Sequence, residues 1–252
     1  MSIWITGDIH GDPRRLTTKY FPEQKGMCKD DYVIILGDFG LIWSGSKEEE
    51  VLLNWLNEKP FTTVFVDGNH ENFDLLNSYP VVDYHGGKAH KIRESVYHLM
   101  RGYVFDICGK KCFCFGGARS HDINDGILDV NDFESKEKFK QVYRKYRKEN
   151  KVFRVNHVSW WKEEMPNQEE MERGRLLLQE NDNKIHFVFS HCAPQEIASL
   201  IGCREPDELT TYFNGLLYNG IVFDRWLFGH YHDNKQIMGK FILLYEQIIQ
   251  IA

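Results

Sequence analysis

Near its start the chain reads IWITGDIHGD (residues 3–12), a short β-rich apolar run followed by a polar segment between glycines. Such a run is typical of a strand, and the glycines permit a sharp turn after it. Because residues i and i+2 of an extended backbone point the same way, Asp8 and His10 can reach one ion together. This stretch therefore predicts a strand whose end carries metal-binding side chains.

The same arrangement recurs four more times. Strands are expected at residues 32–36, 62–66, 185–189 and 225–228, and each runs into a short group that contains His, Asp or Asn. These groups are Gly37-Asp38-Phe39-Gly40, Gly68-Asn69-His70-Glu71, Ser190-His191 and Gly229-His230-Tyr231-His232. The carboxyl ends of strands are where open α/β sheets carry their sites, so the five groups are expected to converge.

The rest of the chain supports an α/β fold with layered sheets. Further strands are expected at 103–107, 111–115, 235–238 and 241–249, and helices at 48–56, 72–76 and 168–179. Strands that alternate with helices, followed by a strand-rich second half, are typical of such a fold. We see no linker or repeat in the 252 residues, and we expect one domain over 1–252.

Composition excludes some classes of protein. The formal charge of −6 argues against a generally basic, histone-like grip on nucleic acid, although it permits a local basic groove. No apolar run approaches the roughly 20 residues that span a bilayer, and the start resembles no signal peptide. The six cysteines form no regular framework, and Cys112 and Cys114 are expected to share a buried strand face after a turn at Gly109. We expect a cytoplasmic protein without a membrane partner.

One segment is strongly basic. Residues 134–151 hold six Lys and two Arg against three acidic residues, and apolar or aromatic residues recur there at helical spacing. Two interpretations stay open for this helix. It is either a solvated helix with one docking face or a basic cap that attracts a polyanionic substrate.

The polar groups at the strand ends offer a mixed set of oxygen and nitrogen ligands. The seven candidates are Asp8, His10, Asp38, Asn69, His191, His230 and His232. Such a set suits Mn, Fe, Zn or Ni better than Ca. One ion rarely takes more than six ligands, so seven predict two ions that share a carboxylate. Two-metal sites, with ions roughly 3.5–4 Å apart, clamp an in-line displacement at phosphorus.

In this order the five motifs resemble those of the calcineurin-like metallophosphoesterase superfamily, which are D-x-H, GD, GNH, a lone H and GH-x-H. The resemblance implies a four-layer αββα sandwich of mixed α/β (α+β) class, with residues from about 127 to 157 as an inserted basic helical cap. It implies a phosphoesterase that hydrolyses a phosphomonoester or phosphodiester with a bridging hydroxide. The implied ligands are Asp8, His10 and His232 for the first metal and Asn69, His191 and His230 for the second, with Asp38 bridging and His70 catalytic.

The sequence departs from one branch of this superfamily. Protein Ser/Thr phosphatases carry GD-x-VDRG, whereas the second motif here is GDFGLIW (residues 37–43). The Asp that orients their catalytic His is absent from this position, which leaves open whether His70 has an acidic partner. The segments GGARSHD (116–122) and SWWKEE (159–164) resemble instead a bacterial and phage group of calcineurin-like phosphoesterases.

Substrate contacts are expected from Arg119, His121 and Arg154, because arginine suits bidentate phosphate binding. Of Trp160 and Trp161, one is expected to pack into the core and the other to stay partly exposed. The five histidines outside the motifs are expected to be ordinary core or surface residues, namely His85, His90, His98, His157 and His186.

Three functions remain open at this point. The first is a dinuclear phosphoesterase acting on a small phosphorylated substrate. The second is a nuclease, which the same metal core would support but which needs a continuous basic groove. The third is a scaffold that retains the fold without the chemistry; it should lack ligands or the catalytic histidine, and all of these are present here. The oligomeric state is left open.

Overall fold

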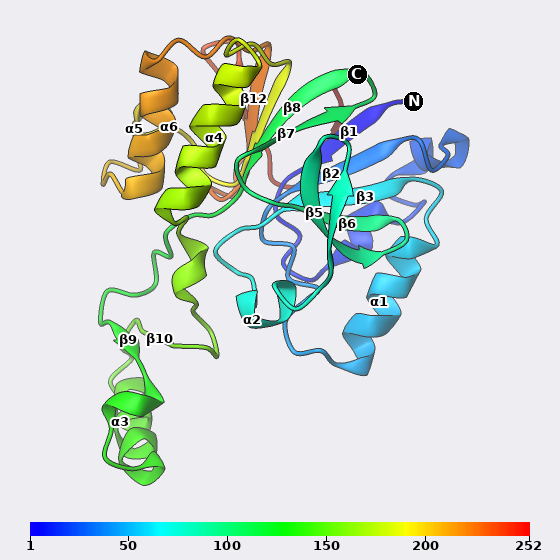
Figure 1. Cartoon of the computed structure of the whole chain (residues 1–252). Helices are drawn as coiled ribbons and strands as arrows, with labels where there is room; N and C mark the ends of the chain where they lie inside the picture. Colours follow the sequence, from blue (N-terminus) through cyan, green and yellow to red (C-terminus); the bar gives the residue numbers. More distant parts are fainter.

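The computed structural model describes residues 1–252, whose strands form two large sheets lying face to face (Figure 1). In spatial order the first sheet contains β15 (Ile248–Gln250), β1 (Ile3–Thr6), β2 (Tyr32–Leu36), β3 (Thr62–Val66), β6 (Val96–Leu99), β5 (Gly87–Arg93) and β4 (Val81–Tyr84). The second contains β13 (Lys235–Ile237), β14 (Phe241–Leu243), β12 (Arg225–Phe228), β11 (Phe187–Ser190), β8 (Lys110–Phe115) and β7 (Tyr103–Ile107).

The centre of each sheet is parallel. Strands β1, β2, β3 and β6 run the same way in the first sheet, as do β8, β11, β12 and β14 in the second. Every residue of β2 and β3 is buried, which is typical of parallel strands covered on both faces. The carboxyl ends of the two sheets meet at one edge of the sandwich, where the backbone N–H of His230 after β12 donates to Asp8 after β1.

Three apolar cores separate four layers. The core between the sheets includes Ile5, Ile34, Phe105, Cys112 and Cys114, so the predicted cysteine face is confirmed. Helices α1 (Lys47–Asn57) and α2 (Phe73–Leu76) cover the outer face of the first sheet. Helices α4 (Gln168–Glu180), α5 (Gln195–Leu200) and α6 (Glu208–Tyr218) cover that of the second. This order confirms the αββα sandwich.

Short 3₁₀ turns complete the regular structure, at Pro13–Leu16, Pro22–Gly26, Val130–Asp132 and Lys162–Glu164. Trp161, at the start of the last of these, is buried in the core beneath the first sheet, whereas Trp160 is partly exposed, as predicted. No helix of the chain has the length and apolar character needed to cross a membrane.

The predicted strand at 241–249 is wrong, because it is two strands in different sheets. Strand β14 pairs with β12, and β15 pairs with β1. The chain crosses between the sheets at Leu244 and Tyr245, so close to Gly7 that a Cβ there would lie 2.1 Å from the Leu244 carbonyl oxygen. A two-residue period shows which face of a strand is apolar but not which sheet the strand joins.

Five of the longer elements were not predicted, namely β4, β5, β6, α5 and α6. Strand β5 reads GKAHKIR, and its partly buried Lys and Arg residues hide the strand in the sequence, although it pairs with both β4 and β6. Helix α6 contains Thr and aromatic residues of modest helix propensity, yet it buries five side chains against the second sheet. Tertiary packing overrides local preference in both cases.

The basic segment lies in a projection that we call the arm, residues 127–157. It contains β9 (Ile127–Leu128), α3 (Lys136–Lys148) and β10 (Arg154–Val155), and β9 and β10 form a separate two-stranded sheet. Figure 1 shows the arm extending away from the sandwich, with α3 at its far end. No residue of α3 is buried, and its aromatic side chains pack within the arm, where Tyr143 and Tyr146 contact Phe153. The helix predicted within residues 134–151 is confirmed as α3.

Candidate metal centre

The glycines of three motifs leave room for a neighbouring polar side chain. A Cβ at Gly37 would lie 2.2 Å from Nδ1 of His191, and a Cβ at Gly68 would lie 2.1 Å from Oδ1 of Asp38. At Gly229 it would lie 2.1 Å from Oδ1 of Asp8. Because no side chain tolerates such distances, these glycines allow the strand ends to close around the site.

Four of the candidate ligand residues have a left-handed backbone. The φ angles are 46° for His10, 44° for Asp38, 68° for His230 and 49° for His232. A non-glycine residue in this region costs about 1–3 kcal/mol and persists where the surrounding structure holds it. The sandwich therefore maintains a strained arrangement that aims these four side chains.

The first group of ligand atoms belongs to Asp8, His10, Asp38 and His232, whose ligand atoms all lie within 4.8 Å of one another. Nε2 of His232 is 3.2 Å from Oδ2 of Asp8 and 3.0 Å from Nε2 of His10. Two imidazoles and two carboxylates at such distances match the oxygen and nitrogen ligands of a transition metal. The residues present here fit a bound metal ion.

The second group lies on the other side of Asp38. Nε2 of His191 is 3.3 Å from Oδ1 of Asp38 and 3.2 Å from Oδ1 of Asn69. The rings of His191 and His230 have their centroids 4.9 Å apart. Oδ2 of Asp38, by contrast, is 3.8 Å from Nε2 of His10 in the first group. The seven predicted ligands thus come together, with Asp38 between two sets.

Backbone contacts orient the ligands of both groups. Nδ1 of His191 donates to the Leu36 carbonyl oxygen at 2.7 Å, which leaves Nε2 free to face the site. The backbone N–H of His230 donates to both oxygens of Asp8, at 3.0 and 3.2 Å. Burial lowers the pKa of His191, but the carboxylates of Asp38 and Asp8 outweigh it and raise the pKa to about 10. The site accordingly favours positive charge, which a metal ion would supply in place of a proton.

Asn69 is held by a chain of buried polar groups that was not predicted. Its Nδ2 donates to Oγ of Ser120 at 3.4 Å, and Oγ of Ser120 donates to Oε2 of Glu164 at 2.6 Å. The backbone N–H of Ser120 donates to Oε1 of Glu164 at 2.9 Å. This chain turns Oδ1 of Asn69 toward His191. Ser120 and Glu164 lie in the segments GGARSHD and SWWKEE, whose resemblance to one phosphoesterase group was the only signal in the sequence.

Glu71 supports the loop that carries Asp38. Its carboxyl group accepts hydrogen bonds from the backbone N–H groups of Phe39 at 2.7 Å and Gly40 at 3.3 Å. Burial, together with the nearby Asp38 carboxylate, raises the pKa of Glu71 to about 8. Glu71 stands beside His70 in the third motif, where no role was predicted for it.

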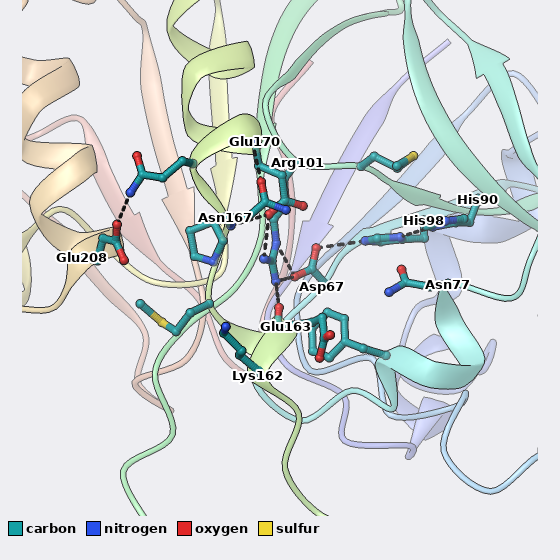
Figure 2. A pocket seen from close by; sticks show the side chains of 15 residues that line it. Asp67, Asn77, His90, His98, Arg101, Lys162, Glu163, Asn167, Glu170 and Glu208 are labelled. Carbon is teal, nitrogen blue, oxygen red and sulfur yellow. Dashed lines mark hydrogen bonds and ion pairs between the residues drawn. The ribbon is translucent and has the colours of Figure 1, made fainter. Parts of the chain in front are cut away.

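A second buried polar network surrounds Asp67, which directly follows β3 (Figure 2). The buried Asp67 carboxylate accepts hydrogen bonds from Nε of Arg101 at 2.8 Å and from His98 at 3.0 Å. His98 in turn contacts His90 at 2.9 Å. These groups line a cavity of about 580 Å³ between α2 and α4. His90 and His98 are core residues, as predicted, and His186 accepts a hydrogen bond from the Lys111 backbone N–H.

The predicted catalytic residue, His70, is partly exposed beside the ligands. Its backbone N–H donates to Oδ1 of Asp38 at 2.8 Å, and its ring centroid is 5.5 Å from that of His10. Burial lowers the pKa of His70, while the carboxylates of Asp38 and Asp122 oppose this shift. The ring makes no hydrogen bond, so neither carboxylate orients it as a direct partner.

The three predicted substrate contacts differ in position. Nε2 of His121 is 2.8 Å from Nε2 of His230, at the edge of the site. Arg154 forms an ion pair with Asp122, a pocket residue that was not predicted. Arg119 is exposed and does not line the pocket. The pocket measures about 400 Å³ and is lined by Asp38, Asn69, His70, His121, Asp122, Ile201, Cys203, His230, Tyr231 and His232.

Comparison with known families agrees with this geometry. Residues 1–234 match the family model for the calcineurin-like phosphoesterases. The chain belongs to this family. It is therefore a metal-dependent phosphoesterase, a hydrolase that acts on phosphate esters, and the group around Asp8 is its candidate metal centre. No curated protein matches the chain significantly.

Proposed function

We propose that this calcineurin-like phosphoesterase holds two divalent transition-metal ions (Mn, Fe, Zn or Ni) that share Asp38, and that it hydrolyses a phosphomonoester or phosphodiester. The observation that carries the proposal is the position of Asp38, whose two carboxylate oxygens face the two ligand groups. Seven ligand side chains exceed what one ion accepts, so two ions account for the set. When bound, such ions act as Lewis acids on the phosphate group and make water more acidic.

The residues around the ligands divide the remaining tasks. His70 stands at the pocket and would donate a proton to the leaving oxygen of the ester. His121 contacts His230 and also lines the pocket, where it would bind the phosphate group of the substrate. Arg154 forms an ion pair with Asp122, which lines the pocket, and its guanidinium would bind a phosphate oxygen of the substrate.

A screen of Mn²⁺, Fe²⁺, Ni²⁺ and Zn²⁺ with p-nitrophenyl phosphate and bis-p-nitrophenyl phosphate tests this function. Turnover should require metal and should saturate at two ions per chain, as measured by elemental analysis of the dialysed protein. Saturation at one ion would contradict the shared Asp38. Absence of turnover with every metal would favour the scaffold interpretation.

We also propose a cytoplasmic location. All six cysteines are free in the structure, and Cys112, Cys114 and Cys192 are buried as small apolar side chains. Such cysteine use is typical of a reducing compartment. Mass spectrometry of the protein from its native cells after alkylation should find all six thiols reduced, and a native disulfide would contradict this location.

A further inference from the structure

The charge of the protein is divided between two regions. Residues 134–151 carry a formal charge of +5 in a chain of −6, so the remaining 234 residues carry −11. Within this basic segment Lys145 and Glu149 form the single ion pair, at 3.9 Å. Arg147 is exposed and has no carboxylate partner, and Lys151 has only the Tyr146 ring, at 4.2 Å. Residues 134–151 therefore carry a net positive charge, most of which no carboxylate pairs with.

Helix stability accounts for only part of this charge, because the helix dipole favours Lys145, Arg147 and Lys148 in the last turn of α3. Lys136 and Lys138 lie in the first turn of α3, where the helix dipole disfavours cations. The pairs Lys136–Lys140 and Arg144–Lys148 place like charges at i and i+4, which destabilises a helix by a few tenths of a kcal/mol per pair. A merely solvated helix gains nothing from the lysines of the first turn or from these like-charged pairs, whereas a surface that binds a polyanion does.

The basic face of the arm continues from the metal pocket. A cavity of about 440 Å³ is lined by basic and aromatic side chains of the arm, including Tyr143, Arg147, Lys151 and Arg154. Asp122 lines this cavity and the metal pocket alike. The ion pair with Arg154 neutralises Asp122 at the junction. A chain of phosphates that leaves the metal pocket would therefore enter a positively charged cavity.

The dimensions of the arm indicate the length of the ligand. Helix α3 has 13 residues and is thus about 20 Å long. A small phosphomonoester would fill the metal pocket and leave this helix without a contact. Tyr143 is 38% exposed and packs on Phe153 at the cavity, and exposed aromatic rings among basic residues are typical of surfaces that stack nucleic-acid bases.

We propose that the arm binds single-stranded nucleic acid and delivers one of its phosphodiesters to the metal pocket. Delivery for cleavage rests on the proposed function, whereas binding to the arm does not. The strand backbone lies along α3, with phosphates at Arg147, Lys151 and Arg154, and the scissile phosphate lies beyond Asp122. The inorganic polyphosphate chain, which has the same charge but no rings, is the alternative that the test must distinguish.

The test measures binding of a fluorescein-labelled single-stranded 20-mer, as DNA and as RNA, by fluorescence anisotropy at several salt concentrations. The full-length H70A variant with Mn²⁺ is used so that the strand stays intact. In this background R147E/K151E should weaken binding about tenfold or more at low salt. The slope of log K against log salt should fall in magnitude by about 1.4, since each lost phosphate contact removes about 0.7.

The matched control is K111E/K184E, which changes the charge equally. Lys111 and Lys184 are exposed at the amino ends of β8 and β11, away from the metal pocket. This pair should change binding less than twofold. The milder pair R147Q/K151Q, with a circular dichroism melt of every variant, separates lost contacts from lost folding.

Three results would overturn the inference. The first is that neither the DNA nor the RNA strand binds, and the second is that both Glu pairs weaken strand binding equally. The third is that polyphosphate competes with the strand while Y143A leaves strand binding unchanged. Hydrolysis of bis-p-nitrophenyl phosphate by the unchanged protein reports the metal centre alone. A protein that hydrolyses this ester without binding the strand refutes the arm proposal only, and one that binds the strand without any hydrolysis refutes the proposed function only.

Discussion

The metal centre and the arm are built on opposite principles. At the metal centre His10, Asp38, His230 and His232 hold left-handed backbones, and buried groups such as Glu164 orient the ligands. In the arm no residue of α3 is buried, and most of its charges face water without a partner. Packing determines the geometry at the metal centre, whereas charge and exposure characterise the arm. Substitutions at the metal centre should therefore reduce turnover or metal binding, whereas substitutions in the arm should change strand binding or stability and leave the metal centre intact.

The largest effect is expected at Asp38. D38N keeps the shape of the side chain but removes the charge that faces both ligand groups. We expect turnover of bis-p-nitrophenyl phosphate to fall about 10⁴-fold or more, because the lost metal contributed several kcal/mol. Elemental analysis should find fewer than two ions per chain. If the D38N protein retained both ions, the Asp38 charge would be dispensable for metal binding. The metal centre would then not differ from the arm in its sensitivity to a single substitution.

His70 separates chemistry from metal binding. H70A should lower kcat about 10²- to 10³-fold, because a proton donor at the leaving oxygen is removed. The number of bound ions should stay the same, since the His70 ring contacts no ligand through a hydrogen bond. Equal losses of metal and turnover would show that His70 is itself a ligand.

Glu164 tests whether orientation beneath the ligands matters. E164A leaves the Ser120 N–H and O–H without their acceptor, and so frees the Asn69 amide. We expect metal affinity to fall about 10- to 100-fold, as for other groups that orient ligands. E164Q keeps one acceptor and should recover part of this loss.

E163A is the matched control, because the Glu163 side chain is exposed and makes no hydrogen bond or ion pair. The metal affinity of all three variants is measured by titrating metal into the protein and recording the activity. Melting curves check that each variant is folded. If E163A and E164A weakened metal binding equally, the Glu164–Ser120–Asn69 chain would have no specific role.

The smallest effect is expected where the arm joins the sandwich. Nδ1 of His157 lies 2.9 Å from Oδ2 of Asp74 on α2, and this contact raises the pKa of His157. The contact therefore stabilises the fold fully below about pH 6.5, and this contribution is lost as pH rises through the raised pKa. Because both side chains are more than half exposed, it amounts to a few tenths of a kcal/mol.

H157N removes the contact and suits the left-handed backbone at this position, where φ is 53°. Urea denaturation at pH 5.5 and pH 8 should show the native protein more stable than H157N at the lower pH, with the difference shrinking at the higher pH. A difference that grew with pH would contradict the assigned contact.

Sequence reasoning succeeded where the chemistry is local. Each ligand follows directly on a short apolar strand, so the residue pattern alone places Asp8, Asp38 and His191 at strand ends. Arg119 was predicted to contact the substrate because it follows a strand and a glycine pair, and in the structure its side chain is exposed and does not line the pocket. Glu164 and Asp122 were missed because their partners lie 44 and 32 residues away in the chain, at Ser120 and Arg154. Contacts of that kind leave no periodic pattern in a sequence.

The order of motifs and the basic composition of residues 134–151 were determined by the sequence alone, because strands, glycine turns and charge depend on residues close together in the chain. Only the tertiary structure decided which oxygen of Asp38 faces which histidine and that Glu164 orients Asn69. The tertiary structure likewise decided that β14 and β15 part at Leu244 into different sheets. The physical reason is that these features depend on packing two sheets together, which brings distant residues within a few ångströms.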